Sequence, residues 1–210
     1  MKITKKELRE YWGKFWYLLW EDNSWKGWVF SIVFLFLFIK LIFFPGLSLV
    51  TGTSLPLAIV ESCSMYHDGN LFSDYDSWWD KHDKKYETFD LEKEIFETFI
   101  FNNGFNKGDI LFIVGINPRK LEVGDVIIFN GEQKNPIIHR VVGIEEQDGK
   151  RIFSTIGDNS NHQLITEKEI SGDRLIGRAV FKVAPYVGWG KLIFFEASRP
   201  PTERGLCSEN

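Results

Sequence analysis

One apolar run near the N-terminus constrains this chain more than any other feature. Residues 28–44 read WVFSIVFLFLFIKLIFF, and only Ser31 and Lys40 within them are polar. A helix of this length extends about 25 Å, at the short end of the roughly 17–25 residues that cross a bilayer. Pro45 follows directly and is expected to end the regular helix. We therefore predict a membrane anchor over residues 27–47, with a buried core helix or a re-entrant segment as the alternative.

Basic residues are distributed unevenly around this anchor. Six lysines and arginines precede it, and after Lys40 the next basic residue is Lys81. The positive-inside rule places the N-terminus in the cytoplasm and the rest of the chain outside the cell membrane. Within the cytoplasmic segment 1–26, residues 8–20 (LREYWGKFWYLLW) combine aromatic and basic side chains. They predict an interfacial helix in contact with membrane lipids.

Short β-rich runs replace the apolar pattern from residue 48 onward. Gly-Asp pairs or glycine-containing turns bound most of them. The runs are residues 57–62, 108–116, 124–131, two strands within 136–158, and 176–183. This pattern predicts a mainly β barrel or sandwich, with the runs at 108–116 and 124–131 as neighbours in a hairpin-like arrangement. The extracytoplasmic domain would cover residues 48–190, and the polar tail within 191–210 is expected to be disordered.

An acidic and aromatic segment, residues 66–105, interrupts the β pattern, and we call it the insert. Apolar residues at 91, 95, 96 and 99 have helical spacing, which predicts a helix there. The interpretation we favour is a helical cover over one end of the barrel. A lid or a flap that rests on the membrane through Trp78 and Trp79 is the alternative.

The composition excludes some classes of protein. The net charge is −4, which argues against nucleic-acid binding. Cys63 and Cys207 are the two cysteines, too few for a disulfide framework. His67, Asp68 and His162 lack a recognisable metal-ligand spacing. No metal or cofactor is expected.

Three separate stretches contain residues suited to nucleophilic catalysis. The first is ESCSMYHDG, residues 61–69; the second is His139 in the apolar strand NPIIHRVVGI; the third is the turn IGDNSN, which contains Asp158. A serine becomes a good nucleophile when a positioned base takes its proton, and a carboxylate can orient that base. Each stretch alone has a simpler interpretation, since a strand histidine is more often a packed side chain and Gly-Asp-Asn-Ser is a common turn.

Taken together, these stretches resemble the signal peptidase I family, in its endoplasmic reticulum and archaeal type. The sequence Ser62-Cys63-Ser64-Met65 matches the Ser-x-Ser-Met motif, and GDVIIF at 124–129 matches a strand motif of the family. His139-Arg140-Val141 and Gly157-Asp158-Asn159 match two further motifs, and IGRA at 176–179 resembles the closing strand. The blocks keep their order from about residue 28 to 190, apart from the insert.

The resemblance implies a role for each matching residue. Ser64 would be the nucleophile, His139 the general base, and Asp158 the carboxylate that orients the histidine. The Ser64 N–H and the Ser62 hydroxyl would form the oxyanion hole. The substrate would be the signal peptide of an exported preprotein, with small residues at the first and third positions before the cut. Apolar residues in 58–60 and 111–114 would line the pockets, and secretion machinery is an expected partner.

The sequence departs from the family pattern at a second acidic residue. Leu164 stands where the family often has an aspartate, and Glu167, Glu169 and Asp173 follow it without a clean alignment. Either Asp158 acts alone or one of these residues replaces the missing acid.

Other functions remain open at this stage. Cys63 could act as a thiol nucleophile with His139, although it occupies the variable position of the motif. The chain could also be an inactive homologue that binds substrates within a secretion complex. A third alternative is a protease dedicated to one class of precursor.

Overall fold

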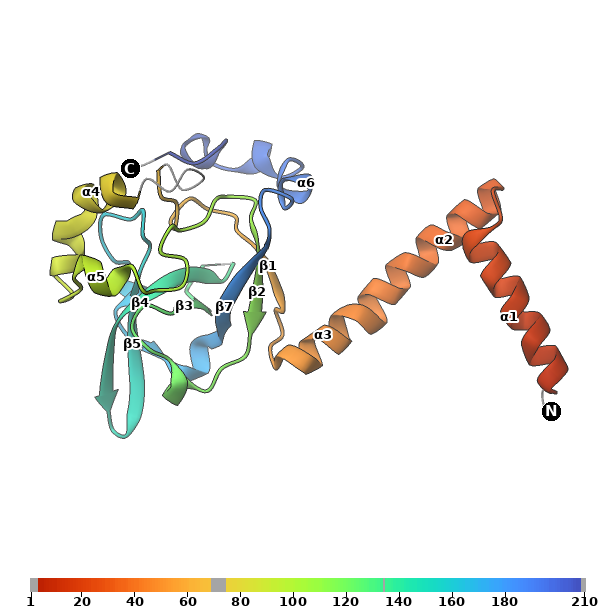
Figure 1. Cartoon of the computed structure of the whole chain (residues 1–210), viewed down its shortest axis with the longest axis horizontal. Helices are drawn as coiled ribbons and strands as arrows, with labels where there is room; N and C mark the ends of the chain where they lie inside the picture. The colour runs from red at the N-terminus through yellow and green to blue at the C-terminus, as the bar shows by residue number, and fades with distance from the viewer. Residues whose placement is uncertain (1–3, 69–74, 134, 209–210) are drawn as a thin grey trace. The chain divides into compact units, whose positions relative to one another are not determined.

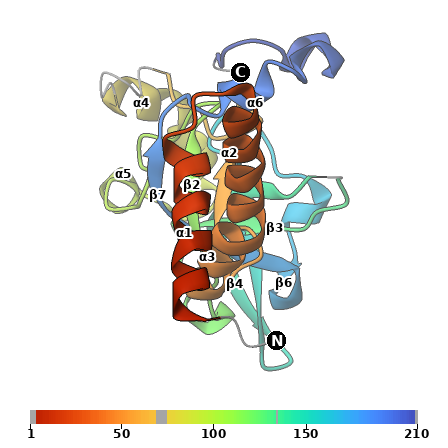
Figure 2. The same ribbon diagram turned by 90° about the vertical axis from the view of Figure 1, so that its right-hand side faces the viewer.

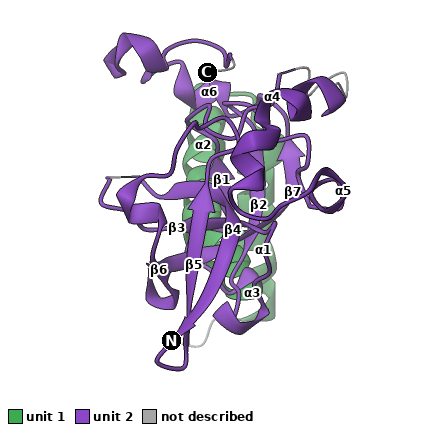
Figure 3. Cartoon of the chain, turned by 90° about the vertical axis from the view of Figure 1, so that its left-hand side faces the viewer, with its two compact units in different colours: residues 1–50 green, residues 51–210 purple. Residues whose placement is uncertain are grey.

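The computed structural model describes residues 4–68, 75–133 and 135–208. Its contacts divide the chain into two compact units, residues 1–50 and 51–210 (Figure 3). Figure 1 labels most of the helices and strands of both units, and β6 is labelled in Figures 2 and 3.

The first unit begins with two helices joined by a short turn. Helix α1, Lys5–Trp20, starts at Thr4, whose side chain and backbone form a capping box. Helix α2, Trp25–Phe38, starts at Ser24, whose hydroxyl accepts a hydrogen bond from the N–H of Gly27. These caps fix the beginning of each helix and so define the turn between them.

Helices α1 and α2 pack against each other next to this turn (Figure 2). The ring of Phe15 meets Phe30 and Phe34 edge-on, with centroids 5.8 and 5.2 Å apart. The hydroxyl of Ser31 donates to the carbonyl of Leu19 at 3.0 Å. One of the two polar side chains in the apolar run therefore has a partner on α1.

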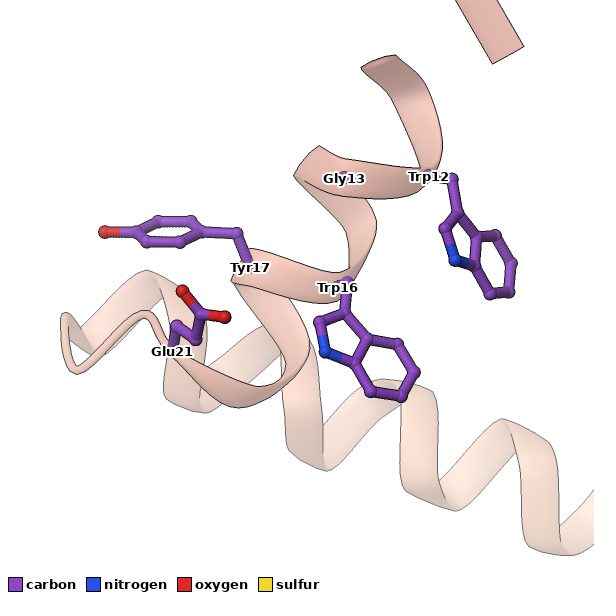
Figure 4. Close-up of a pocket in the computed structure, with 5 residues that line it drawn as sticks. All are labelled: Trp12, Gly13, Trp16, Tyr17 and Glu21. Carbon is purple, nitrogen blue, oxygen red and sulfur yellow. The ribbon is translucent and has the colours of Figure 1, made fainter. Parts of the chain in front are cut away.

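The outer surface of α1 is aromatic. Trp12, Trp16 and Tyr17, with Gly13 and Glu21, line a shallow hollow on this helix (Figure 4). Gly13 has no side chain to fill it. The indoles of Trp12 and Trp16 are about half exposed or more.

The apolar helix continues past Pro45, contrary to our prediction. After α2 the chain forms a π-helical segment, Ile39–Phe43, and then α3, Phe44–Thr51. The N–H of Phe44 bonds to the carbonyl of Ile39, five residues earlier, so the backbone is already widened where proline removes a donor. The resulting helix, Trp25–Thr51, has 27 residues and is about 40 Å long. Within the described ranges it is the one helix long and apolar enough to cross a membrane.

The second unit is built on one antiparallel sheet of seven strands in the order β1-β2-β7-β3-β4-β5-β6. The strands are β1 (Leu57–Ile59), β2 (Ile110–Val114), β3 (Val126–Phe129), β4 (Ile137–Gln147), β5 (Lys150–Ile156), β6 (Ile170–Ser171) and β7 (Leu175–Ala184). The predicted β-rich runs all contain strands, and the mainly β fold class is confirmed.

The predicted pairing of 108–116 with 124–131 is wrong. Strand β7 lies between β2 and β3 and pairs with both, so that Ile113 is opposite Ala179 and Ile127 is opposite Arg178. The ten residues of β7 are long enough to contact β2 with one half and β3 with the other. The two runs are close in the sequence, which favoured a hairpin between them. Instead, β7 pairs with β2 along one edge and with β3 along the other.

Residues 66–68 and 75–105 of the insert are described, with 69–74 outside the described residues, and the described part contains helices that differ in detail from the prediction. Its main helix is α4, Tyr75–Glu87, whereas residues 91–99 contain only the single turn α5, Lys93–Phe96. Trp78 and Trp79 are 1% and 6% exposed, because they pack with Tyr86 and Phe96 in an aromatic cluster. This burial contradicts a membrane-resting flap carried by the two tryptophans.

The C-terminal segment, as far as it is described (to residue 208), is bonded to the sheet domain, contrary to the predicted disorder. The ammonium group of Lys107 is buried and bonds to Glu196 at 2.5 Å and to the carbonyl of Glu203 at 2.7 Å. Cys207 forms a disulfide with Cys63, 144 residues earlier. The disulfide places Cys207 next to the Ser-x-Ser-Met motif.

Candidate active site

The turn that follows β1 presents the two serines of the motif. Residues 62–65 leave the strand as a turn, in which the Tyr66 N–H donates to the Cys63 carbonyl. The Ser62 and Ser64 hydroxyls lie 3.1 Å apart. Met65 is buried and anchors the turn in the core. The sulfur of Cys63 is bonded to Cys207, so it is not free to act as a nucleophile in this state.

A second segment, residues 157–160, holds this turn from the other side, and we call it the catalytic loop. The Asn159 N–H donates to the Ser64 carbonyl at 2.8 Å, and the Asn159 side chain donates to the Cys63 carbonyl at 3.1 Å. The Asp158 N–H points at the sulfur of Met65, 3.4 Å away. The position of Ser64 therefore depends directly on this loop.

His139, on β4, directs its side chain toward the catalytic loop at Gly157. It is 5% exposed, and its backbone pairs with Ile127 of β3. A Cβ atom added to Gly157 would lie 2.9 Å from His139 Nε2 and 2.7 Å from the Ser64 carbonyl oxygen. The imidazole and the serine turn thus converge on Gly157, where there is room only for a hydrogen.

The carboxylate next to His139 belongs to Glu167. Its Oε1 contacts His139 Nδ1, and its Oε2 accepts from the Leu164 N–H at 2.7 Å. The Thr155 hydroxyl lies 3.3 Å from Oε1. Glu167 ends a short 3-10 helix, Ile165–Glu167, and is fully buried. Among the three acids left open by the sequence, Glu169 and Asp173 are exposed and Glu167 occupies the site.

Asp158 has partners other than the predicted one. Its carboxylate accepts from Arg140 (2.6 Å from Nη2), from His67 Nε2 (2.9 Å) and from the Tyr86 hydroxyl (2.9 Å). Burial opposes its ionisation, but the Arg140 guanidinium and the hydrogen bonds hold the pKa of Asp158 well below its usual range. The carboxylate in contact with His139 is that of Glu167, whereas Asp158 is directed into this separate buried cluster.

His67, one of the partners of Asp158, is buried, with 2% of its surface exposed. Its ring stacks on Trp78 with centroids 3.6 Å apart, and burial lowers the pKa of His67 despite the neighbouring Asp158. The Lys85 ammonium donates to the backbone carbonyl of Asp158, and burial lowers the pKa of Lys85 to about 8. One feature of the sequence pointed to this cluster. The match to the family motifs breaks off after Met65, and His67 and Lys85 lie in the insert that begins there.

The arrangement has the parts required for acyl transfer. A carboxylate at Nδ1 accepts a hydrogen bond from the N–H on that side of the imidazole, so Nε2 keeps its lone pair and faces the serine turn. Within the ranges described, the Ser64 N–H has no hydrogen-bond partner, as a donor reserved for a substrate oxygen requires. His162 is exposed and lies outside this arrangement.

The fold is thus a mainly antiparallel β domain of the signal peptidase-like type, with one candidate membrane helix before it. In comparisons with known proteins, no family model matches the chain. The chain is similar to the signal peptidase complex catalytic subunit SEC11C of Homo sapiens, with 32% identity over 96 residues that cover 42% of this chain and 50% of that protein. It is also similar to SEC11 of Lachancea thermotolerans, with 29% identity over 121 residues, 56% of this chain and 50% of the relative.

A third relative, SEC11 of Zygosaccharomyces rouxii, is 41% identical over 58 residues, which are 27% of this chain and 34% of that protein. The chain spans about half the length or less of the curated relatives it matches. These similarities support a relationship between this chain and the signal peptidase family, since the matched relatives are named as catalytic subunits of a signal peptidase complex.

Proposed function

We propose that this protein is a membrane-anchored serine endopeptidase that cleaves signal peptides from exported preproteins. One observation carries the proposal: the Ser64 turn and His139 Nε2 converge on Gly157, with Glu167 at the opposite nitrogen of the imidazole. The similarity to catalytic subunits of a signal peptidase complex supports the same reaction.

In this mechanism Ser64 Oγ attacks the carbonyl carbon of the scissile bond while His139 Nε2 accepts the hydroxyl proton. The imidazolium then donates that proton to the leaving amine, which departs and leaves an acyl group on Ser64. A water molecule, deprotonated by the same nitrogen, releases the acid and restores the serine. Glu167 holds the ring in the correct tautomer and stabilises the imidazolium, which is the role that the sequence had suggested for Asp158.

The oxyanion of the tetrahedral intermediate would be bound by the Ser64 N–H and the Ser62 hydroxyl. Ser62 is exposed and its hydroxyl lies 3.1 Å from that of Ser64, close enough to turn toward the developing charge. Loss of one oxyanion donor typically lowers kcat about 100- to 1,000-fold.

An extended substrate would bind along β1. This strand is at an edge of the sheet, so one of its sides is available for an added strand. Ala58 and Val60 are buried together with Leu111 and Ile113 beneath it. This closely packed apolar floor favours small side chains in the substrate.

The helix Trp25–Thr51 would anchor the enzyme, with the N-terminus in the cytoplasm and the β domain outside the cell membrane. The aromatic surface of α1 would lie in the interface among lipid headgroups. Anchoring raises the effective concentration of the enzyme near inserted signal peptides. Partner subunits from the secretion machinery are a further expectation, since the relatives are named as subunits of a signal peptidase complex.

The test is cleavage of a preprotein with alanine at the first and third positions before the cut, by the full chain in liposomes. Wild type should cleave the preprotein directly after the alanine at the first position, and the Ser64→Ala and His139→Ala variants should not cleave it. His162→Ala is the matched control, because His162 is exposed and lies outside the site. Binding of the preprotein by wild type without cleavage, in liposomes of several lipid compositions, would refute the enzyme and favour a substrate-binding homologue.

A further inference from the structure

Helix α4 of the insert contacts the catalytic loop through two consecutive residues. The Tyr86 hydroxyl donates to Asp158 Oδ1 at 2.9 Å. The Lys85 ammonium donates to the Asp158 carbonyl at 2.5 Å and lies 3.4 Å from the Ser160 carbonyl. The insert therefore holds both the side chain and the backbone of this loop.

The hydroxyl of Tyr86 is held rigidly. Its ring is fully buried, stacks on Trp79 with centroids 5.4 Å apart, and meets Phe96 edge-on at 4.7 Å. Burial raises the pKa of Tyr86 well above its usual range, so the hydroxyl stays protonated and donates. Tyr75 joins the same aromatic cluster, but among the described residues its buried hydroxyl has no partner.

The catalytic loop transmits this restraint to the nucleophile. Asn159 donates its N–H to the Ser64 carbonyl at 2.8 Å, and the Asp158 N–H faces the sulfur of Met65. Gly157 is in close contact with both His139 and the serine turn. A shift of the loop would therefore change the geometry between Ser64 Oγ and His139 Nε2.

We propose that the insert is a brace for the catalytic loop, in which Tyr86 and Lys85 are positioning residues for the cleavage reaction. This inference rests on the proposed function and extends it to a segment that lies outside the family pattern. Neither side chain touches the substrate in this proposal. Both act through the loop, so their removal lowers turnover and leaves substrate affinity unchanged.

The test compares Tyr86→Phe with Tyr75→Phe in the full chain, using the same preprotein in liposomes. Both substitutions remove one buried hydroxyl from one aromatic cluster, but only that of Tyr86 bonds to the loop. We expect Tyr86→Phe to lower kcat about tenfold with KM unchanged, and Tyr75→Phe to match wild type. Lys85→Met should act in the same direction, with Lys84→Met, at an exposed position, as its control. Equal kcat for the two tyrosine variants, or a change in KM alone, would overturn the inference.

Hydrogen exchange provides a readout that does not require cleavage. The amide of Asn159 should exchange faster in Tyr86→Phe than in Tyr75→Phe after correction for global stability measured by urea unfolding. If wild type cleaves no preprotein, the proposed function fails, and this exchange rate still decides whether the brace exists. Equal exchange rates in the two variants overturn the inference whichever way the cleavage assay turns out.

Discussion

Replacing Glu167 by glutamine tests which carboxylate serves His139, the proposed general base. The Glu167 carboxylate faces donors at both oxygens: His139 Nδ1 and the Thr155 hydroxyl at one, and the Leu164 N–H at the other. A glutamine has a single acceptor oxygen in the same space. Its NH₂ group must therefore face either the backbone N–H or the imidazole.

Each orientation of the glutamine is costly. If the NH₂ group faces the Leu164 N–H, two donors meet, and the buried NH₂ group is left unsatisfied, which costs about 1–3 kcal/mol. If it faces His139, it donates to Nδ1 and forces the proton onto Nε2, the atom that must accept from Ser64. The corresponding Asp→Asn change in a chymotrypsin-type triad lowers kcat about 10,000-fold. We expect a loss of about 100- to 10,000-fold, of which the lower limit corresponds to ~2.7 kcal/mol.

Asp158→Asn is the matched comparison, and its main effect should be on stability. Removing this charge leaves the Arg140 guanidinium buried without its counter-ion, which typically costs about 3–5 kcal/mol. The assay measures kcat on the preprotein and unfolding in urea for both variants. If folded Asp158→Asn loses turnover while Glu167→Gln keeps kcat within about threefold of wild type, Asp158 is the catalytic carboxylate and this reasoning is refuted.

Three further predictions follow from the same contacts. Gly157→Ala should lower kcat more than about tenfold in steady-state kinetics. Gly143→Ala is the control and should leave kcat unchanged, because a Cβ added there meets its nearest neighbour at 3.4 Å. Cys207→Ser should lower the free energy of unfolding by about 2–5 kcal/mol, and urea unfolding of reduced wild type should match it. Because the folded-state pKa of His67 is lowered, the unfolded protein binds more protons below about pH 6.5. The contribution of His67 to the free energy of unfolding should therefore be fully present above that pH and decrease as the pH falls to 5.5. His67→Gln should reduce this dependence of the free energy of unfolding on pH, as measured by urea titrations at each pH.

The sequence was informative wherever local chemistry determines local structure. Gly108 and Gly124 precede β2 and β3 with φ of 92° and 97°, a left-handed conformation that favours glycine, so these Gly-Asp turns marked the strands correctly. The serine motif, His139 and Glu167 were all named as candidates from the sequence. The helix through Pro45 was missed, because a π-helical segment has no recognisable sequence signal.

The rest of the site depends on contacts between distant segments. Glu167 is 28 residues from His139, and only the path of the chain after β5 decides that it, rather than Glu169, faces the imidazole. The partners of Asp158 include Tyr86 and His67 from the insert, which no motif aligns. Their roles could not be predicted because burial and pairing are set by the tertiary fold.

The disulfide between Cys63 and Cys207 has a consequence for the order of events in biogenesis. The turn that contains Ser64 lies within the first third of the chain, yet the cross-link next to Ser64 cannot form before residue 207 has been synthesised. In a reducing compartment the same turn would lack this cross-link. A newly made chain therefore completes the surroundings of its serine late, after synthesis has passed Cys207 and in an oxidising environment.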